Sequence, residues 1–142
     1  MTQKRLDEYF MKVAQLTAEL SYAQRKKVGA VLVKDNRIIS IGYNGTPKNW
    51  PDNICEEVLD DGTLKTKSIV VHAESNALFW CSKTEIITEG ATMYLTLSPC
   101  STCALAIIQS GIKRVAYLEE YRDTSGIDIL KKVGILVDKI TF

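Results

Sequence analysis

The sequence predicts an α/β fold with three layers, α/β/α, around a mixed five-stranded sheet whose last two strands are parallel. Three observations support this fold class: a helical apolar pattern opens the chain, two β-rich segments follow, and strands then alternate with helices. A hairpin followed by β–α units favours a mixed sheet covered by helices. The helix expected between the final two strands provides a crossover long enough to make them parallel.

The first half of this order begins with an amphipathic helix. Its apolar residues recur at spacings of three and four, the period of one helical face; they are Leu6, Tyr9, Phe10, Val13, Leu16 and Leu20. Strands are expected at 28–33 and 38–43, joined by a turn at Asp35-Asn36. This segment therefore predicts a β-hairpin behind the first helix.

Two polar stretches interrupt the pattern. Residues 42–53 are crowded with Gly, Pro and Asn, and residues 59–68 are almost entirely polar. Both compositions predict irregular structure, and we expect the second stretch to be mobile.

The second half alternates helix and strand. A helix is expected over 72–82, and a strand over 91–98 runs directly into Pro99, which suits the first turn of another helix. Gly111 is expected to end that helix. The remaining strands and helix are expected at 113–120, 125–134 (with Ser125 as its cap) and 135–142.

Length and composition limit the class of protein. A chain of 142 residues, 46% hydrophobic and 25% charged, is ordinary for one soluble domain, and we expect a single domain over 1–142. The net charge of +1 gives no strongly basic character, which argues against a polynucleotide partner.

The chain's beginning and its apolar segments bear on location. The first 16 residues carry acids and lack an unbroken apolar run, unlike a signal peptide. No apolar stretch approaches the roughly 20 residues that span a bilayer. We therefore expect a cytoplasmic protein with no membrane partner, in which cysteines serve as thiols or metal ligands.

The densest chemical pattern combines H-A-E at 72–74 with P-C-S-T-C at 99–103. Cys100 and Cys103, three positions apart at a helix start, can meet one ion together with His72, the only histidine. A lone histidine is more often structural, and C-x-x-C also occurs as a redox pair, but that pair explains neither Pro99 nor H-A-E. One nitrogen and two thiolates suit zinc with an open fourth position, as in catalytic sites.

Glu74 stands two residues after His72 and need not bind the metal. Helix N-termini aimed at the ion add partial positive charge, which stabilises thiolates and a metal-bound hydroxide. A carboxylate beside zinc-bound water can take its proton and pass it on. The alternative for Glu74, a solvated acid at a helix start, loses weight beside three zinc ligands.

The arrangement H-A-E followed by P-C-x-x-C resembles the signature of zinc-dependent nucleobase deaminases. The loop G-Y-N-G-T-P at 42–47, together with V-H-A-E-S-N-A-L, E-G-A-T-M-Y-L-T-L-S-P-C-S-T-C and the D-I-L-K-K-V-G-I tail, resembles deoxycytidylate (dCMP) deaminases over nearly the whole chain. This resemblance implies the cytidine deaminase-like fold within the cytidine/deoxycytidylate deaminase superfamily.

The resemblance also implies a reaction. Zinc-activated hydroxide would attack C4 of dCMP, with Glu74 as proton shuttle, giving dUMP and ammonia and feeding dTMP synthesis. Backbone near Ala73 and Ser98 would bind the base, and Asn44 the sugar side; the alternative for Asn44 is a simple turn residue. The residues implied for the 5′-phosphate are Arg25, Tyr121 and Arg122, with Lys27 and Lys48 weaker.

Assembly and regulation follow only from the resemblance. It implies a homohexamer activated by dCTP and inhibited by dTTP, with Mg²⁺ on the regulatory nucleotide. Apolar Leu78, Phe79 and Trp80 around one short helix suit subunit packing, and core burial explains them equally well. Many relatives bind a second, structural zinc, but only Cys55 precedes H-A-E here, so we expect one Zn²⁺ per chain.

Two alternatives remain. A polynucleotide deaminase, acting on tRNA adenosine or single-strand cytidine, shares the zinc motifs, but the balanced charge and the G-Y-N-G-x-P loop argue against it. A non-enzymatic zinc module would not need Glu74 beside the ligands.

Overall fold

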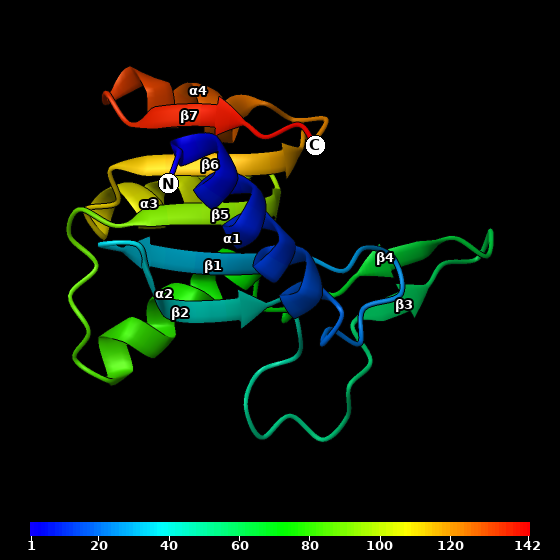
Figure 1. Ribbon diagram of the computed structural model, residues 1–142. Helices are drawn as coiled ribbons and strands as arrows, with labels where there is room; N and C mark the ends of the chain where they lie inside the picture. Colours follow the sequence, from blue (N-terminus) through cyan, green and yellow to red (C-terminus); the bar gives the residue numbers. More distant parts are fainter.

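The computed structural model describes residues 1–142, and its centre is a five-stranded sheet in the order β2-β1-β5-β6-β7 (Figure 1). The strand β1 pairs antiparallel with both β2 and β5, whereas β5–β6 and β6–β7 are parallel pairs. The predicted mixed sheet with its last two strands parallel is confirmed. The strands are β1 Gly29–Lys34, β2 Arg37–Tyr43, β5 Thr92–Leu97, β6 Arg114–Glu119 and β7 Leu136–Lys139.

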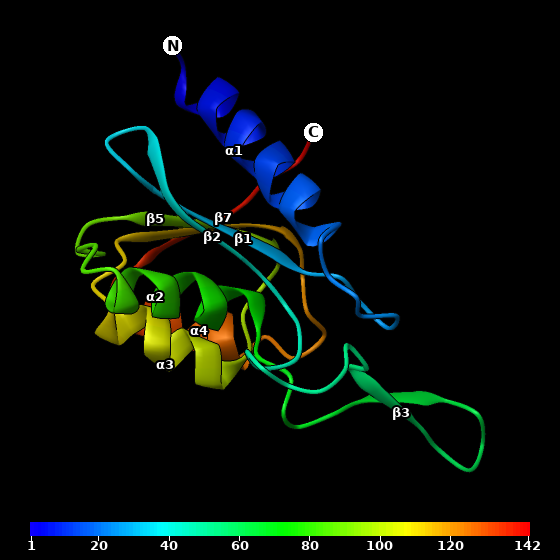
Figure 2. The ribbon, with the colours of Figure 1, turned by 90° about the horizontal axis from the view of Figure 1, so that it is seen from below.

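Helices cover both faces of this sheet (Figure 2). One face carries α1, Gln3–Ala18, and the opposite face carries α2, α3 and α4. The three-layer α/β/α architecture is therefore confirmed. The helices of the second face are α2 Ala73–Lys83, α3 Ser101–Gln109 and α4 Ser125–Lys132.

The central strands are buried on both faces, which explains why they read as continuous apolar runs. On β1, Leu32 points to the core under α2–α4, while Val31 points to the core under α1. Met93 and Tyr94 divide in the same way on β5. Alternation of successive side chains across a strand produces these two separate cores.

The first helix forms as predicted, and half of the expected stripe faces the sheet: Phe10 is buried, and Leu6 and Val13 pack against the same core. Tyr9, Leu16 and Leu20 are exposed. Small and flexible residues take their place against the sheet, because a helix lying close over a strand needs short side chains at the contact. The buried residues of α1 are Asp7, Phe10, Met11, Ala14, Thr17 and Ala18.

A second, two-stranded sheet forms where irregular structure was expected. The strands β3, Glu56–Val58, and β4, Leu64–Thr66, pair antiparallel. Figures 1 and 2 show this hairpin projecting from the body of the protein. We call residues 55–67 the arm. The expectation of irregular structure in 59–68 is wrong for residues 64–66, which form the strand β4 and pair with β3. The mobility of this stretch stays a prediction.

Turns and helix ends agree with the sequence except at two caps. Asp35 and Asn36 have φ of 51° and 58°, the left-handed pair that a tight hairpin turn requires, and Gly111 follows α3 with φ 74°. Pro99 lies before the N-cap of α3, which is Cys100, rather than in its first turn. Thr124, not Ser125, is the N-cap of α4.

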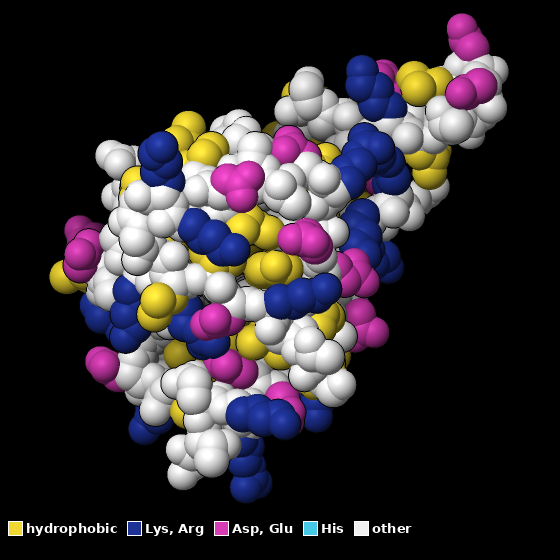
Figure 3. Space-filling view, turned by 90° about the horizontal axis from the view of Figure 1, so that it is seen from above, with side chains coloured by type: hydrophobic (Ala, Val, Ile, Leu, Met, Phe, Trp, Pro, Cys, Tyr) yellow, Lys and Arg dark blue, Asp and Glu magenta, His cyan; other side chains and the backbone are white.

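The surface carries no single sign of charge on the face with β7 and α4, where acidic and basic side chains are interspersed (Figure 3). On α2, Leu78 is buried, but Phe79 is 63% exposed and Trp80 is 49% exposed. No helix is both long and apolar enough to cross a bilayer.

Candidate zinc and substrate site

The chemistry-bearing residues meet at one edge of the sheet. The parallel strands β5 and β6 end there at Leu97 and Glu119, and the chain turns directly from β5 into α3. The N-terminus of α2 opens at the same edge, since Gly45, just after β2, pairs with Val71, just before His72. This is the edge of an α/β sheet at which ligands bind.

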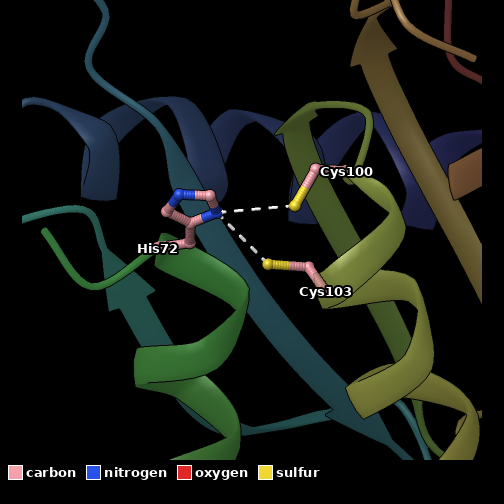
Figure 4. Close-up of side chains that lie close together, drawn as sticks. All are labelled: His72, Cys100 and Cys103. Carbon is pink, nitrogen blue, oxygen red and sulfur yellow. Dashed lines mark hydrogen bonds between the residues drawn. The ribbon is translucent and has the colours of Figure 1, made fainter. Parts of the chain in front are cut away.

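The three predicted ligands converge (Figure 4). His72 is the N-cap of α2 and Cys100 is the N-cap of α3, and neither side chain caps its own helix, so both are free to turn toward each other. The Nδ1 atom of His72 lies 3.3 Å from Sγ of Cys103 and 3.7 Å from Sγ of Cys100. All three ligand atoms lie within 4.8 Å of one another.

This spacing fits zinc. A tetrahedral zinc, with Zn–N of about 2.0 Å and Zn–S of about 2.3 Å, holds its nitrogen and sulfur ligands about 3.5 Å apart. The two observed N–S distances, 3.3 and 3.7 Å, bracket that value. No other group of three histidine, cysteine or acidic side chains is close enough to hold a metal ion.

The two ligand sulfurs strongly affect each other's ionisation. Hydrogen bonds from Cys103 and His72 hold the pKa of the Cys100 thiol well below its usual range. The Cys103 thiol has a raised pKa, because it hydrogen-bonds Cys100, is buried and lies near acidic groups. The negative charge of one sulfur disfavours ionisation of the other, and a divalent cation bound between them would favour the ionised form of both.

Glu74 lies beside the ligand cluster at the second position of α2 and is 4% exposed. Burial raises the pKa of its carboxyl to about 7, and His72, Cys100 and Cys103 are among the groups that act on it. It lines the same cavity as His72 and Cys100. The sequence-predicted proton carrier therefore faces the metal ligands instead of solvent.

The cavity at this edge has a volume of about 200 Å³. Six of the predicted substrate-site residues were Arg25, Asn44, Ala73, Ser98, Tyr121 and Arg122, and all except Arg122 line it. Arg122 is exposed beside Tyr121, Lys27 is exposed next to Lys26, and Lys48 lines a different groove between β2 and α2.

Asn44 has an additional structural task. Its Oδ1 accepts a hydrogen bond from the backbone N–H of Val28 at 2.9 Å, and its Nδ2 donates to the carbonyl of Lys26 at 2.8 Å. Ser98 is similarly engaged, because its hydroxyl accepts from the backbone N–H of Tyr121 at 2.7 Å. Both residues line the cavity and hold the loops around it.

Five residues of the cavity lining were not predicted as site residues, and two of them are polar. Lys26 lines the cavity and forms an ion pair with Glu119 at the end of β6, and Thr66 reaches it from the arm. The run of cations Arg25-Lys26-Lys27 in the sequence indicates a cationic wall, but it does not show which of the three side chains line the cavity. Nothing local in the arm sequence indicates that Thr66 lies at the site.

Two glycines allow the close packing that positions the helices. A Cβ on Gly42 would lie 2.3 Å from the carbonyl oxygen of Ala73, so β2 closely approaches the start of α2. A Cβ on Gly126 would lie 2.1 Å from the carbonyl oxygen of Pro99 and 2.8 Å from that of Cys100. The start of α4 therefore packs directly on the backbone that presents a metal ligand.

The fold and the site together define an α/β/α protein with a three-residue candidate zinc site and a buried carboxylate at the carboxyl edge of its sheet. Residues 4–119 match the sequence model of the cytidine and deoxycytidylate deaminase zinc-binding region. The chain belongs to this deaminase family, and the resemblance seen in its motifs is confirmed.

Individual relatives agree with this assignment. The deoxycytidylate deaminase of Mycobacterium phage D29 is 40% identical over 129 residues, covering 84% of this chain and 99% of the phage protein. That of Saccharomyces cerevisiae is 37% identical over 141 residues, which are 96% of this chain but 45% of the yeast protein. The chain thus spans under half the length of the yeast relative.

A solved structure extends the agreement to three dimensions. The dCMP deaminase from cyanophage S-TIM5, in complex with dCMP and dUMP, matches with a TM-score of 0.89 and 42% identity over 98% of both chains. The cytidine deaminase-like fold is therefore confirmed.

Proposed function

We propose that residues 1–142 form one deaminase domain that hydrolyses dCMP to dUMP and ammonia. The observation that carries the proposal is one cavity lined by His72, Cys100 and Glu74, with Arg25 and Lys26 on the same wall. Cys103 completes the candidate metal site beside it. The names of the D29 and S-TIM5 relatives, and the nucleotides bound in the latter, support the same substrate.

Zinc, when bound by these three ligands, supplies a Lewis acid that makes a water more acidic. Glu74 accepts a proton from the water that attacks C4 of the base and delivers it to N3. It then takes the second proton, from the hydroxyl now on C4, and gives it to the exocyclic amine, which leaves as ammonia as the C4 carbonyl forms. Its position against the ligands, sheltered from solvent, supports this role, and general acid–base help of this kind contributes about 10²–10⁴ in rate.

The rest of the cavity binds the nucleotide. Backbone at Ala73 and Ser98 hydrogen-bonds the base, and Asn44 lies on the sugar side. Arg25, Tyr121 and Arg122 receive the 5′-phosphate, with Lys26 added to the cationic wall because it lines the cavity. Cationic side chains are the usual partners of a phosphate.

The decisive experiment measures ammonia release from dCMP, CMP, deoxycytidine and a tRNA anticodon stem. We expect dCMP to give the highest kcat/KM. A preference for the tRNA stem, with an affinity that falls steeply as salt rises, would replace this proposal with the polynucleotide alternative.

The phosphate assignment is tested by paired variants. We expect Arg25→Ala to raise the KM for dCMP about tenfold or more while changing that for deoxycytidine little, because only dCMP carries the phosphate. Arg122→Ala, outside the cavity lining, should produce a smaller effect of the same kind. Equal effects of Arg25→Ala on both substrates would remove Arg25 from the phosphate site.

Assembly, regulation and location belong to the same proposal. We infer a homohexamer regulated by dCTP and dTTP with Mg²⁺, on the family resemblance, and the exposed Phe79 and Trp80 support subunit packing. All four cysteines are free, which suits the reducing cytoplasm. Adding dCTP or dTTP to the ammonia assay tests the regulation.

A further inference from the structure

Glu56 is a buried carboxylate that the proposed reaction does not use. It is the first residue of β3 and is only 7% exposed. None of the protein's ion pairs includes it. A buried charge is costly unless hydrogen bonds or a partner charge compensate it. The groups that hydrogen-bond Glu56 therefore stabilise its buried position.

Those groups are two consecutive backbone amides, of Gln24 and Arg25, in the segment that also lines the cavity. The N–H groups of Gln24 and Arg25 both donate to Oε2 of Glu56, each at 3.0 Å. Hydrogen bonds to an ionised acceptor are stronger than those between neutral groups. The arm is thereby tied to a segment that lies more than 30 residues earlier in the chain.

The segment 24–28, which we call the strap, brings two cations to the cavity. Arg25 and Lys26 line it, and their positions depend on how the strap backbone is held. Asn44 holds the later end through Lys26 and Val28. Glu56 is the side chain that holds the earlier end, at the backbone of Arg25 itself.

The base of the arm also builds part of the cavity wall. Thr66 on β4 is the direct cross-strand partner of Glu56, and it lines the cavity. Beside this pair, Cys55 packs in a small buried cluster with Ala23 and Val70, and Val70 is another cavity residue. Glu56, which bonds the strap, and Thr66, which lines the cavity, thus lie on opposite strands of one hairpin.

We propose that Glu56 is a positioning residue for substrate recognition: through the amides of Gln24 and Arg25 it fixes the cationic wall against which the nucleotide's phosphate binds. The arm then sets the enzyme's preference for a phosphorylated substrate without contacting the reacting atoms. This inference rests on the proposed function, because it concerns the same cavity.

The test compares Glu56 with its exposed neighbour on the same strand. The variants are Glu56→Gln, which keeps one acceptor oxygen but loses the charge, Glu56→Ala, and the control Glu57→Gln. We expect Glu56→Ala to raise the KM for dCMP about tenfold with kcat within about twofold, and Glu56→Gln to give an intermediate increase. The KM for deoxycytidine should stay unchanged in all variants.

Hydrogen exchange of the strap provides a readout independent of activity. The amides of residues 24 and 25 should exchange faster in Glu56→Gln than in the wild type and Glu57→Gln, while the central strands keep their protection. Unchanged exchange, or a KM increase equal for dCMP and deoxycytidine, would overturn the inference. A wild-type protein that does not deaminate dCMP would refute the proposed function. The hydrogen exchange of the strap amides would still test whether Glu56 holds the strap.

Discussion

The proposed mechanism divides the chemistry between His72, Cys100 and Cys103, which would hold the zinc ion, and Glu74, which would move a proton. The ligands come from the starts of two helices, so their side chains are directed by helix geometry and not by flexible loops. Glu74 follows His72 by two positions on α2 and lines the same cavity beside the ligand cluster, without belonging to the group of three that could hold the metal.

Exchanging Glu74 for glutamine tests this division. We expect Glu74→Gln to keep its zinc, because the carboxylate is not a ligand, and to lose about 10²-fold or more in kcat, because the amide cannot carry the proton. Elemental analysis and ammonia release from dCMP measure the two quantities. Glu85→Gln, an exposed acid beyond the end of α2, is the control. Activity of Glu74→Gln within tenfold of the wild type would exclude the role.

Gly126 is a residue whose missing side chain matters for the metal. The methyl group of Gly126→Ala would collide with the carbonyls of Pro99 and Cys100, so either α4 or the Cys100 backbone must move. We expect zinc affinity to fall about tenfold or more, as it does when groups supporting a ligand are disturbed. Competition with a fluorescent chelator measures it, and Asp128→Ala on the exposed side of α4 should leave it unchanged.

Among the secondary-structure elements, α1 is joined to the sheet by a buried polar cluster. Arg114 on β6 donates from Nη1 and Nη2 to the carboxylate of Asp7 on α1 at 2.8 and 2.9 Å, and the hydroxyl of Tyr94 on β5 donates to the same carboxylate at 2.6 Å. Burial alone would raise the pKa of Asp7, but these hydrogen bonds outweigh it and hold the pKa below its ordinary value. The cluster therefore stabilises the folded state when Asp7 is ionised.

Replacing Asp7 with asparagine should weaken this attachment. We expect Asp7→Asn to lower the free energy of unfolding at pH 7 by about 3 kcal/mol, the cost of breaking a buried pair. Because the folded pKa is depressed, the contribution is present above the ordinary pKa of 3.8 and disappears as pH falls below it. Urea unfolding of both proteins at pH 7 and below pH 3.8 measures the difference. A difference that does not shrink at the acidic pH would contradict the ion-pair explanation.

At the scale of the whole molecule, the candidate metal site lies where α2, α3 and the sheet edge meet. In the arm, Cys55 packs against Ala23 and Val70, and Glu56 bonds to the strap. Ordering of this region therefore rests on a small apolar cluster and on hydrogen bonds.

The metal content checks this arrangement. Purified protein should contain one zinc per chain, and removing it with a chelator should lower Tm, because an ion bound only by the folded state stabilises that state. Elemental analysis and a thermal melt, before and after chelation, are the measurements. Two zinc ions per chain would show that the arm binds a metal after all.

Prediction from sequence succeeded where a short pattern carries the information. The strand pattern of 91–98 and the Asp35-Asn36 turn are local signals, and the structure contains both. The buried face of α1 was misjudged in part, because Leu16 and Tyr9 satisfy helical periodicity, while close packing on β1 selects Ala14. The arm was missed because three-residue strands with polar side chains have no recognisable period.

The sequence alone determined the ligand types, the carboxylate beside them and the order of helices and strands, because spacing along a helix or strand is a local property. Only the tertiary structure decided which residues form the cavity. It joined Arg25 to Glu56 and Asp7 to Arg114, the latter across 107 positions, and turned Thr66 toward the site. Such pairs arise from the packing of elements on a common sheet, and no periodicity within either segment encodes its distant partner.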